Sequence, residues 1–120
     1  MKNLRWSWKT LNKEKILTLV GFAYKSRKLV SGEGITLEYI KSNKAKLVFI
    51  ASDASENTRK RISDKCNFRS IELVDIFTRY EIGKAIGKDE RVAVGITDQN
   101  FADSIKKLLG GGAYAKNESL

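Results

Sequence analysis

Five consecutive apolar residues, Leu47-Val48-Phe49-Ile50-Ala51, restrict the fold of this chain more than any other feature. The run is rich in β-branched and aromatic residues and shows no alternation with polar positions, so both faces of the segment must be covered. It is also too short for a buried helix. We therefore predict the central strand of a sheet with helices on both faces. Ligands gather where the strands of such sheets end, so residues 52–58 are the first candidate for a functional loop.

The chain has 120 residues, which fits one domain with a core of its own. Hydrophobic residues make up 42% and charged residues 31%, a composition typical of a globular protein, and no apolar run is long enough to span a membrane. Lys2 and Arg5 are followed by Trp6-Ser7-Trp8-Lys9 instead of the apolar core of a signal peptide. We therefore expect a cytoplasmic protein without a membrane partner.

The sequence disfavours most catalytic chemistry. It contains no histidine and a single cysteine, Cys66, which removes Ser-His-Asp and Cys-His catalysis, histidine-bound metals and internal disulfides. Residues 83–89, Gly-Lys-Ala-Ile-Gly-Lys-Asp, resemble a phosphate-binding loop, but they have one residue too few between the glycines and lack the Ser or Thr after the lysine. Asp53, Asp75 and Asp98 follow expected strands and could hold Mg²⁺, although Asp at such positions more often caps a helix. We expect no enzyme and no nucleotide cofactor.

Positive charge is the strongest global indication of a partner. The chain has 23 Lys and Arg against 14 Asp and Glu, a formal net charge of +9. Such an excess on a small domain favours an anionic partner, and nucleic acid is the most common one. The alternative is a basic surface that serves only solubility.

The remaining segments alternate between helix and strand. Helical spacing predicts helices over residues 12–26, 35–42, 55–66 and 79–86 and from residue 99, and short apolar runs predict strands over 29–31, 70–74 and 92–96. This alternation indicates an α/β/α three-layer sandwich with a four-stranded mixed, largely parallel sheet. Residues 12–109 form the expected single domain. Residues 110–120 follow as a flexible tail, and residues 1–11 precede as a basic, aromatic arm whose Trp6 and Trp8 either stack on RNA bases or pack on the domain edge.

Two glycines mark the turn between the first strand and the second helix. Gly32-Glu33-Gly34 would let backbone N–H groups face a phosphate or a base edge at a helix N-terminus. The alternative is that the glycines serve backbone geometry alone.

Three separated stretches resemble one known family. They are Lys28-Leu29-Val30-Ser31-Gly32, residues 43–54 and residues 81–87. Together they look like the ribosomal L7Ae/L30e superfamily of kink-turn RNA-binding proteins, and residues 12–109 resemble its bacterial YlxQ branch. The resemblance implies an L30e-like sandwich and a non-enzymatic protein that binds structured, ribosomal RNA, with ribosomal proteins as further partners and no cofactor.

The resemblance also implies where RNA binds. In the family the contacts come from the turn into the second helix, the loop after the central strand and the loop before the last strand. We expect these loops at one end of the sheet, as a cationic rim. The expected RNA-binding residues, with neighbouring charged side chains, are Lys28, Gly32, Glu33, Gly34, Glu38, Lys41, Asp53, Ser55, Arg79, Gly87, Lys88, Asp89 and Arg91.

The chain departs from the family at the base-reading positions. Kink-turn binders carry Gly-x-Asn-Glu followed three residues later by Lys, and the positions of Asn, Glu and Lys hold Gly34, Ile35 and Glu38 here. Ile35 cannot accept a hydrogen bond from a guanine, and Glu38 repels phosphate. Two functions therefore stay open. One is binding of structured RNA, a kink-turn included; the other is a protein-interaction adapter on the ribosome or transcription machinery that has lost kink-turn recognition.

Overall fold

The structure is a computed structural model that describes residues 2–110, with side chains from residue 12 onward. One four-stranded sheet has the order β1-β4-β2-β3. Its strands are β1 (Leu29–Ser31), β2 (Leu47–Ile50), β3 (Leu73–Val74) and β4 (Ala93–Ile96). The helices are α1 (Lys2–Lys25), α2 (Glu33–Lys41), α3 (Glu56–Arg69), α4 (Arg79–Ala85) and α5 (Gln99–Leu109).

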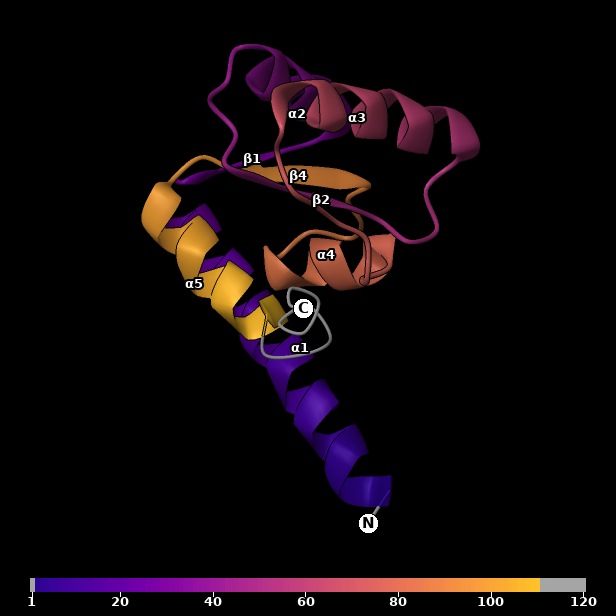
Figure 1. The fold of residues 1–120 in the computed structure, drawn as a ribbon, viewed down its shortest axis with the longest axis vertical. Coiled ribbons are helices and arrows are strands. Elements are labelled where there is room, and N and C mark those ends of the chain that lie inside the picture. The colour runs from indigo at the N-terminus through magenta and orange to yellow at the C-terminus, as the bar shows by residue number, and fades with distance from the viewer. Residues whose placement is uncertain (1, 111–120) are drawn as a thin grey trace.

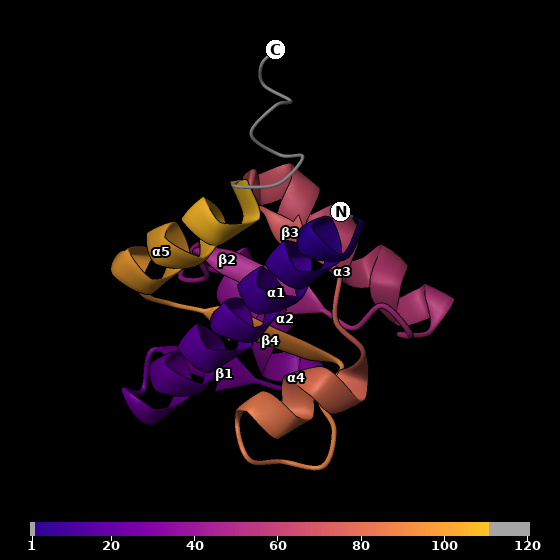
Figure 2. The ribbon, with the colours of Figure 1, turned by 90° about the horizontal axis from the view of Figure 1, so that it is seen from below.

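The helices cover both faces of the sheet, so the predicted three-layer sandwich is confirmed. Helices α2 and α3 lie on one face and α1, α4 and α5 on the other, as Figure 1 shows. In the second view α1 runs between α4 and α5 (Figure 2). All four residues of β2 are buried: Leu47 and Phe49 join the core beneath α1, whereas Val48 and Ile50 join the core beneath α2 and α3. The uninterrupted apolar run thus corresponds to the strand that helices cover on both faces of the sheet.

The sheet is mixed, as predicted, but the expectation that it is largely parallel is wrong. Strand β2 pairs in parallel with β3, whereas β4 is antiparallel to both β1 and β2. The cause is the connection that precedes β4. Helix α4 has seven residues, about 10 Å of rise, and the loop after it returns the chain to the sheet end at which β3 stopped. Strand β4 must then run in the opposite direction.

Helix α1 begins at Lys2 and not at Asn12, because residues 2–11 contain neither Gly nor Pro to stop it. Asn12, the expected cap, lies within the helix, and its Nδ2 donates to the Leu108 carbonyl of α5 (3.3 Å). The first turns of α1 extend beyond the sandwich in Figure 1. The side chains of Trp6 and Trp8 lie outside the described residues, and so does the expected tail from residue 111.

Local capping determines where the helices meet the loops. Ser55 accepts from the Thr58 N–H at the start of α3 (3.2 Å), and Thr78 forms a capping box with Glu81 at the start of α4. Helices α2, α3 and α4 begin at the sheet end where β1, β2 and β3 finish. None of the helices in the described part of the chain is long and apolar enough to cross a membrane.

Candidate nucleic-acid interface

The loops expected to bind RNA do meet at one end of the sheet. Ser31 at the end of β1 is opposite Val94, and Ile50 at the end of β2 is opposite Ala93. Backbone hydrogen bonds join the loops beyond these strands: Gly32 N–H donates to the Ala93 carbonyl (2.9 Å). We call this surface the loop rim and define it as residues 32–35, 52–55, 75–80 and 87–91.

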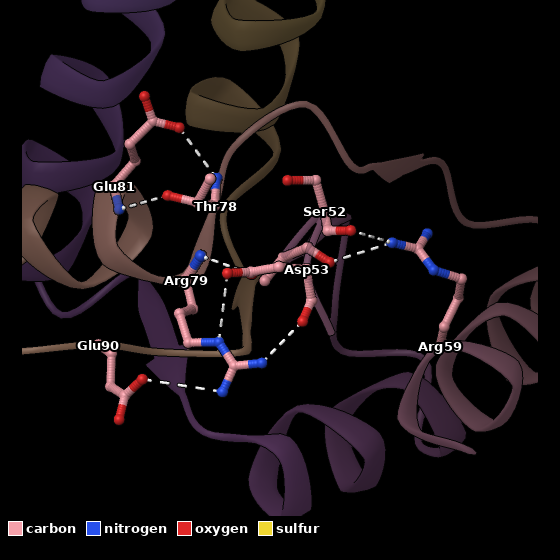
Figure 3. Close-up of polar contacts among 8 residues, drawn as sticks. Ser52, Asp53, Arg59, Thr78, Arg79, Glu81 and Glu90 are labelled. Atoms are coloured by element: carbon pink, nitrogen blue, oxygen red, sulfur yellow. Dashed lines mark hydrogen bonds and ion pairs between the residues drawn. The ribbon is translucent and has the colours of Figure 1, made fainter. Parts of the chain in front are cut away.

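Arg79 joins three segments of the rim (Figure 3). Its backbone N–H donates to Asp53 Oδ1 (3.0 Å), its Nη2 donates to the Asp53 carbonyl (2.7 Å), and its Nη1 lies 3.8 Å from Glu90 Oε1. The pKa of Asp53 is lowered, chiefly by the hydrogen bond from the Arg79 backbone. The guanidinium of Arg79 thus holds the rim together and is not free for a phosphate.

Two arginines of α3 also reach into the rim. Arg59 Nη2 donates to the carbonyls of Ala51 (3.2 Å) and Ser52 (3.0 Å), and its Nη1 pairs with Asp75 (3.2 Å). Figure 3 shows this side chain beside the loop that follows β2. Arg61 pairs with Glu33 at the start of α2. These contacts hold the exit of β2 and the first turn of α2 against α3.

The rim is electrically balanced, so the expected cationic rim is not what the structure presents. Its own cations are Arg79, Lys88 and Arg91, and its carboxylates are Glu33, Asp53, Asp75, Asp89 and Glu90. When Arg59 and Arg61 of α3 are counted with them, the cations and the carboxylates are equal in number. Arg91 Nε donates to Ser31 Oγ (2.7 Å) and its Nη1 to the Glu90 carbonyl (2.7 Å), whereas the exposed Lys88 lies 6.0 Å from the centre of the Tyr24 ring.

Open backbone and exposed apolar side chains are the other properties of the rim. A Cβ added at Gly34 would have no atom within 4 Å, and Gly32 has a φ of 121° that side chains rarely adopt. Ile35 is 44% exposed in the first turn of α2, and Tyr80 is 62% exposed in the first turn of α4. Ile76, before α4, is 40% exposed. Sequence reasoning missed Ile76 and Tyr80, although large apolar residues next to the Thr78 cap were a usable signal.

The expected site residues do not all belong to the rim. Those in its four segments are Gly32, Glu33, Gly34, Asp53, Ser55, Arg79, Gly87, Lys88, Asp89 and Arg91. Glu38 is exposed in the second turn of α2, outside the rim. Lys28 and Lys41 lie at the opposite end of the sheet, because Lys28 precedes β1 and Lys41 ends α2. They are therefore not part of the loop rim, and their role in RNA binding stays a prediction.

The carboxylates considered for Mg²⁺ have other partners. Asp53 and Asp75 bind Arg79 and Arg59, and Asp98 accepts from the Phe101 N–H at the start of α5 (2.9 Å). Among residues 12–110, no group of three or more Asp, Glu, Cys or His side chains is placed to share a metal ion. Cys66 is buried, and burial raises the pKa of its thiol to about 11.

Residues 14–106 match the model of the Ribosomal protein L7Ae/L30e/S12e/Gadd45 family. The chain belongs to this family. The chain is 41% identical over 100 residues to the RNA-binding protein YlxQ of Enterococcus faecium, and the aligned region covers 83% of this chain and 96% of that protein. It is 43% identical over 91 residues to YlxQ of Bacillus subtilis, with coverage of 76% and 91%. The chain is thus a YlxQ-type member, as the resemblance predicted.

Solved structures share this fold. A protein of unknown function from Bacillus halodurans superposes with a TM-score of 0.76 at 35% identity, covering 79% of this chain and 96% of that one. The 15.5kD RNA binding protein of Giardia lamblia superposes with a TM-score of 0.73 at 19% identity, covering 83% and 86%. At 19% identity the second similarity concerns the fold alone.

Proposed function

We propose that this chain binds structured RNA at its loop rim and catalyses no reaction. The observation that carries the proposal is the convergence of the four rim segments around open glycine backbone at the start of α2. The family membership and the printed RNA-binding role of the YlxQ relatives support it.

The proposed contacts use backbone and apolar groups more than free cations. The first turn of α2 leaves N–H groups without an intrahelical acceptor, and beside Gly34 no side chain keeps a sugar-phosphate backbone away. Tyr80 presents an exposed ring on which an unpaired base can stack. The ligand that suits this set is an RNA with an internal loop, such as a kink-turn, because a plain duplex offers no unstacked base.

A titration of labelled RNAs tests the proposal. A kink-turn RNA and a duplex made of its two stems are each titrated by fluorescence anisotropy with the wild-type chain and with Tyr80→Ala. Stacking of one base is worth about 1–3 kcal/mol, so we expect the kink-turn RNA to bind roughly tenfold more tightly than the duplex. Tyr80→Ala should remove most of that difference.

A charge placed at the open glycine supplies an independent test. Gly34→Glu adds a carboxylate to the first turn of α2, where the helix dipole favours it, so the fold should be retained. Repulsion of a phosphate there should weaken kink-turn binding by about tenfold or more. Thr18→Glu makes the same change of charge on the exposed face of α1 and is the control. Equal affinities for both variants would refute the rim as the RNA site, and no saturable binding to either RNA would favour the adapter function.

A further inference from the structure

A group of basic side chains lies at the end of the sheet opposite the loop rim. We call it the basic edge; its members are Lys25, Arg27, Lys28, Lys41, Lys44 and Lys46. They occupy the turn between α1 and β1 and the loop between α2 and β2, both at the left of Figure 1. The loop from β4 to α5 lies at the same end.

Backbone contacts fix the two halves of the basic edge beside one strand. Thr97 N–H donates to the Lys28 carbonyl (2.9 Å), and Lys46 N–H donates to the Ile96 carbonyl (2.7 Å). Lys28 and Lys46 therefore lie on either side of the end of β4, about 10 Å apart across two strand spacings. That distance is close to the Debye length at physiological salt, so one bound polyanion is attracted by both halves together.

These cations differ from the rim arginines in their partners. Among the described residues, no ion pair within 4 Å involves Lys25, Arg27, Lys28 or Lys41. Lys44 Nζ lies 5.6 Å from the centre of the Tyr39 ring, which leaves its charge in place. The carboxylates of Asp98 and Glu72 are also at this end: Asp98 accepts from the Phe101 N–H, and Glu72 immediately precedes β3 beside the start of β2. Net positive charge is therefore available here, whereas at the rim it is balanced.

Helix dipoles account for part of this set. Lys25 and Lys41 lie in the last turns of α1 and α2, where a cation is favoured. Lys28, Lys44 and Lys46 are outside the helices, so the dipoles do not require them. Arg27 has a φ of 62°, a left-handed conformation in which glycine is preferred and a side chain is disfavoured. A charged side chain at that position has a cost in stability that a binding role would explain.

We propose that the basic edge binds the phosphate backbone of duplex RNA, independently of the loop rim. Ammonium groups on flexible side chains contact phosphates as point charges and do not recognise individual bases, so this contact is independent of the RNA sequence. With the rim at the other end of the sheet, one molecule can hold an internal loop at one end and a helical segment at the other.

The test uses a labelled blunt RNA duplex and two variants with equal charge. The edge variant combines Lys28→Gln, Lys41→Gln and Lys44→Gln, and the control combines Lys15→Gln, Lys106→Gln and Lys107→Gln on the α1–α5 layer. Each lost phosphate contact lowers the slope of log affinity against log salt by about 0.9 and the affinity at 0.15 M salt by about fivefold. The edge variant should lose about 2.7 from the slope and on the order of a hundredfold in affinity. Equal losses in both triple variants, or none in the edge variant, would overturn the proposal.

Arg27→Gly separates binding from folding, because it removes the charge and the strained conformation at once. We expect a higher melting temperature and about fivefold weaker duplex binding. Unchanged duplex affinity would contradict the proposal, and so would competition by polyglutamate as effective as that by unlabelled duplex. The edge variant should keep the roughly tenfold preference for the kink-turn RNA over the duplex, which depends on Tyr80 at the rim, so a failure at the rim and a failure at the basic edge are distinguishable.

Discussion

Gly83 offers a sharp test of how the loop before β4 is positioned. Gly83 is buried in α4, and a Cβ built on it would lie 2.5 Å from Glu90 Cα, 2.7 Å from Glu90 N and 2.9 Å from the Asp89 carbonyl carbon. All three atoms are backbone and cannot rotate away. The loop is also tied to α4, because Lys88 N–H donates to the Gly83 carbonyl (2.8 Å) and Arg91 N–H to the Arg79 carbonyl (3.0 Å).

The magnitude for Gly83→Ala follows from two opposing terms. Relief of a 2.5 Å contact needs a shift of roughly 1 Å in a hydrogen-bonded loop, which places the cost near the upper end of overpacking, about 3 kcal/mol. Alanine has a higher helix propensity than glycine, which stabilises the folded state by about 1 kcal/mol. The net loss is about 2 kcal/mol, a factor of about 30 in the folding equilibrium and about 8–16 °C in melting temperature.

Gly34→Ala is the matched control, because Gly34 is also helical but has nothing within 4 Å of the added Cβ. There the helix term acts alone, and we expect stability to rise by about 0.5–1 kcal/mol. Urea unfolding of both variants measures the two changes with one m-value as a check on the denatured state. Shifts of the same sign in Gly83→Ala and Gly34→Ala would refute the close approach of α4 to residues 89–90.

Three further outcomes can be checked. Thr36 is fully buried, and its Oγ1 has no hydrogen-bond partner within the described part of the chain, so Thr36→Val should raise the urea midpoint by the equivalent of about 1 kcal/mol; a lower midpoint would contradict this. The lowered pKa of Asp53 adds stability above the pKa of the unfolded carboxyl, and that stability disappears as pH falls through the folded value. Asp53→Asn should therefore flatten the loss of stability below about pH 4, and parallel acid unfolding curves would oppose the assignment. Burial of Cys66, with its pKa raised to about 11, predicts that Ellman's reagent labels it at about pH 8 no faster than the chain unfolds; immediate labelling of the folded chain would argue against burial.

The elements that could be predicted are those whose signals are local. The run around Phe49, the Ser55 cap and the helix expected over residues 79–86 each carry their own pattern, and the structure has an element at each place. No local signal indicates the direction of β4, since an alternation of helices and strands is compatible with a parallel or an antiparallel strand at that position. It depends on where the chain lies after α4, which the approach of Gly83 to residues 89–90 decides.

The candidate site divides in the same way. The alternation of helices and strands, together with the family resemblance, was enough to predict that the rim segments meet, but the partners of the rim arginines were not predictable. Arg79 meets Asp53 from 26 positions away, and Arg91 meets Ser31 from 60, so the charges could be counted from the sequence but not paired. Lys28 and Lys41 lie away from the rim, because a residue before a strand or at the end of the following helix belongs to the other end of the sheet.

The position of β4 affects how the molecule can be built during synthesis. Strands β1 and β2 are separated by β4 and pair with it on both sides, so β2 with β3 is the one strand pairing of the described sheet that can form before residues 93–96 exist. Closing the sheet requires contacts between residues more than 60 positions apart, such as Leu29 with Ile96, which slows folding relative to local pairing. A chain that ends before β4 would leave the edges of β1 and β2 open to pair with other chains. Most of the chain must therefore have left the ribosome before β1 can pair with β4.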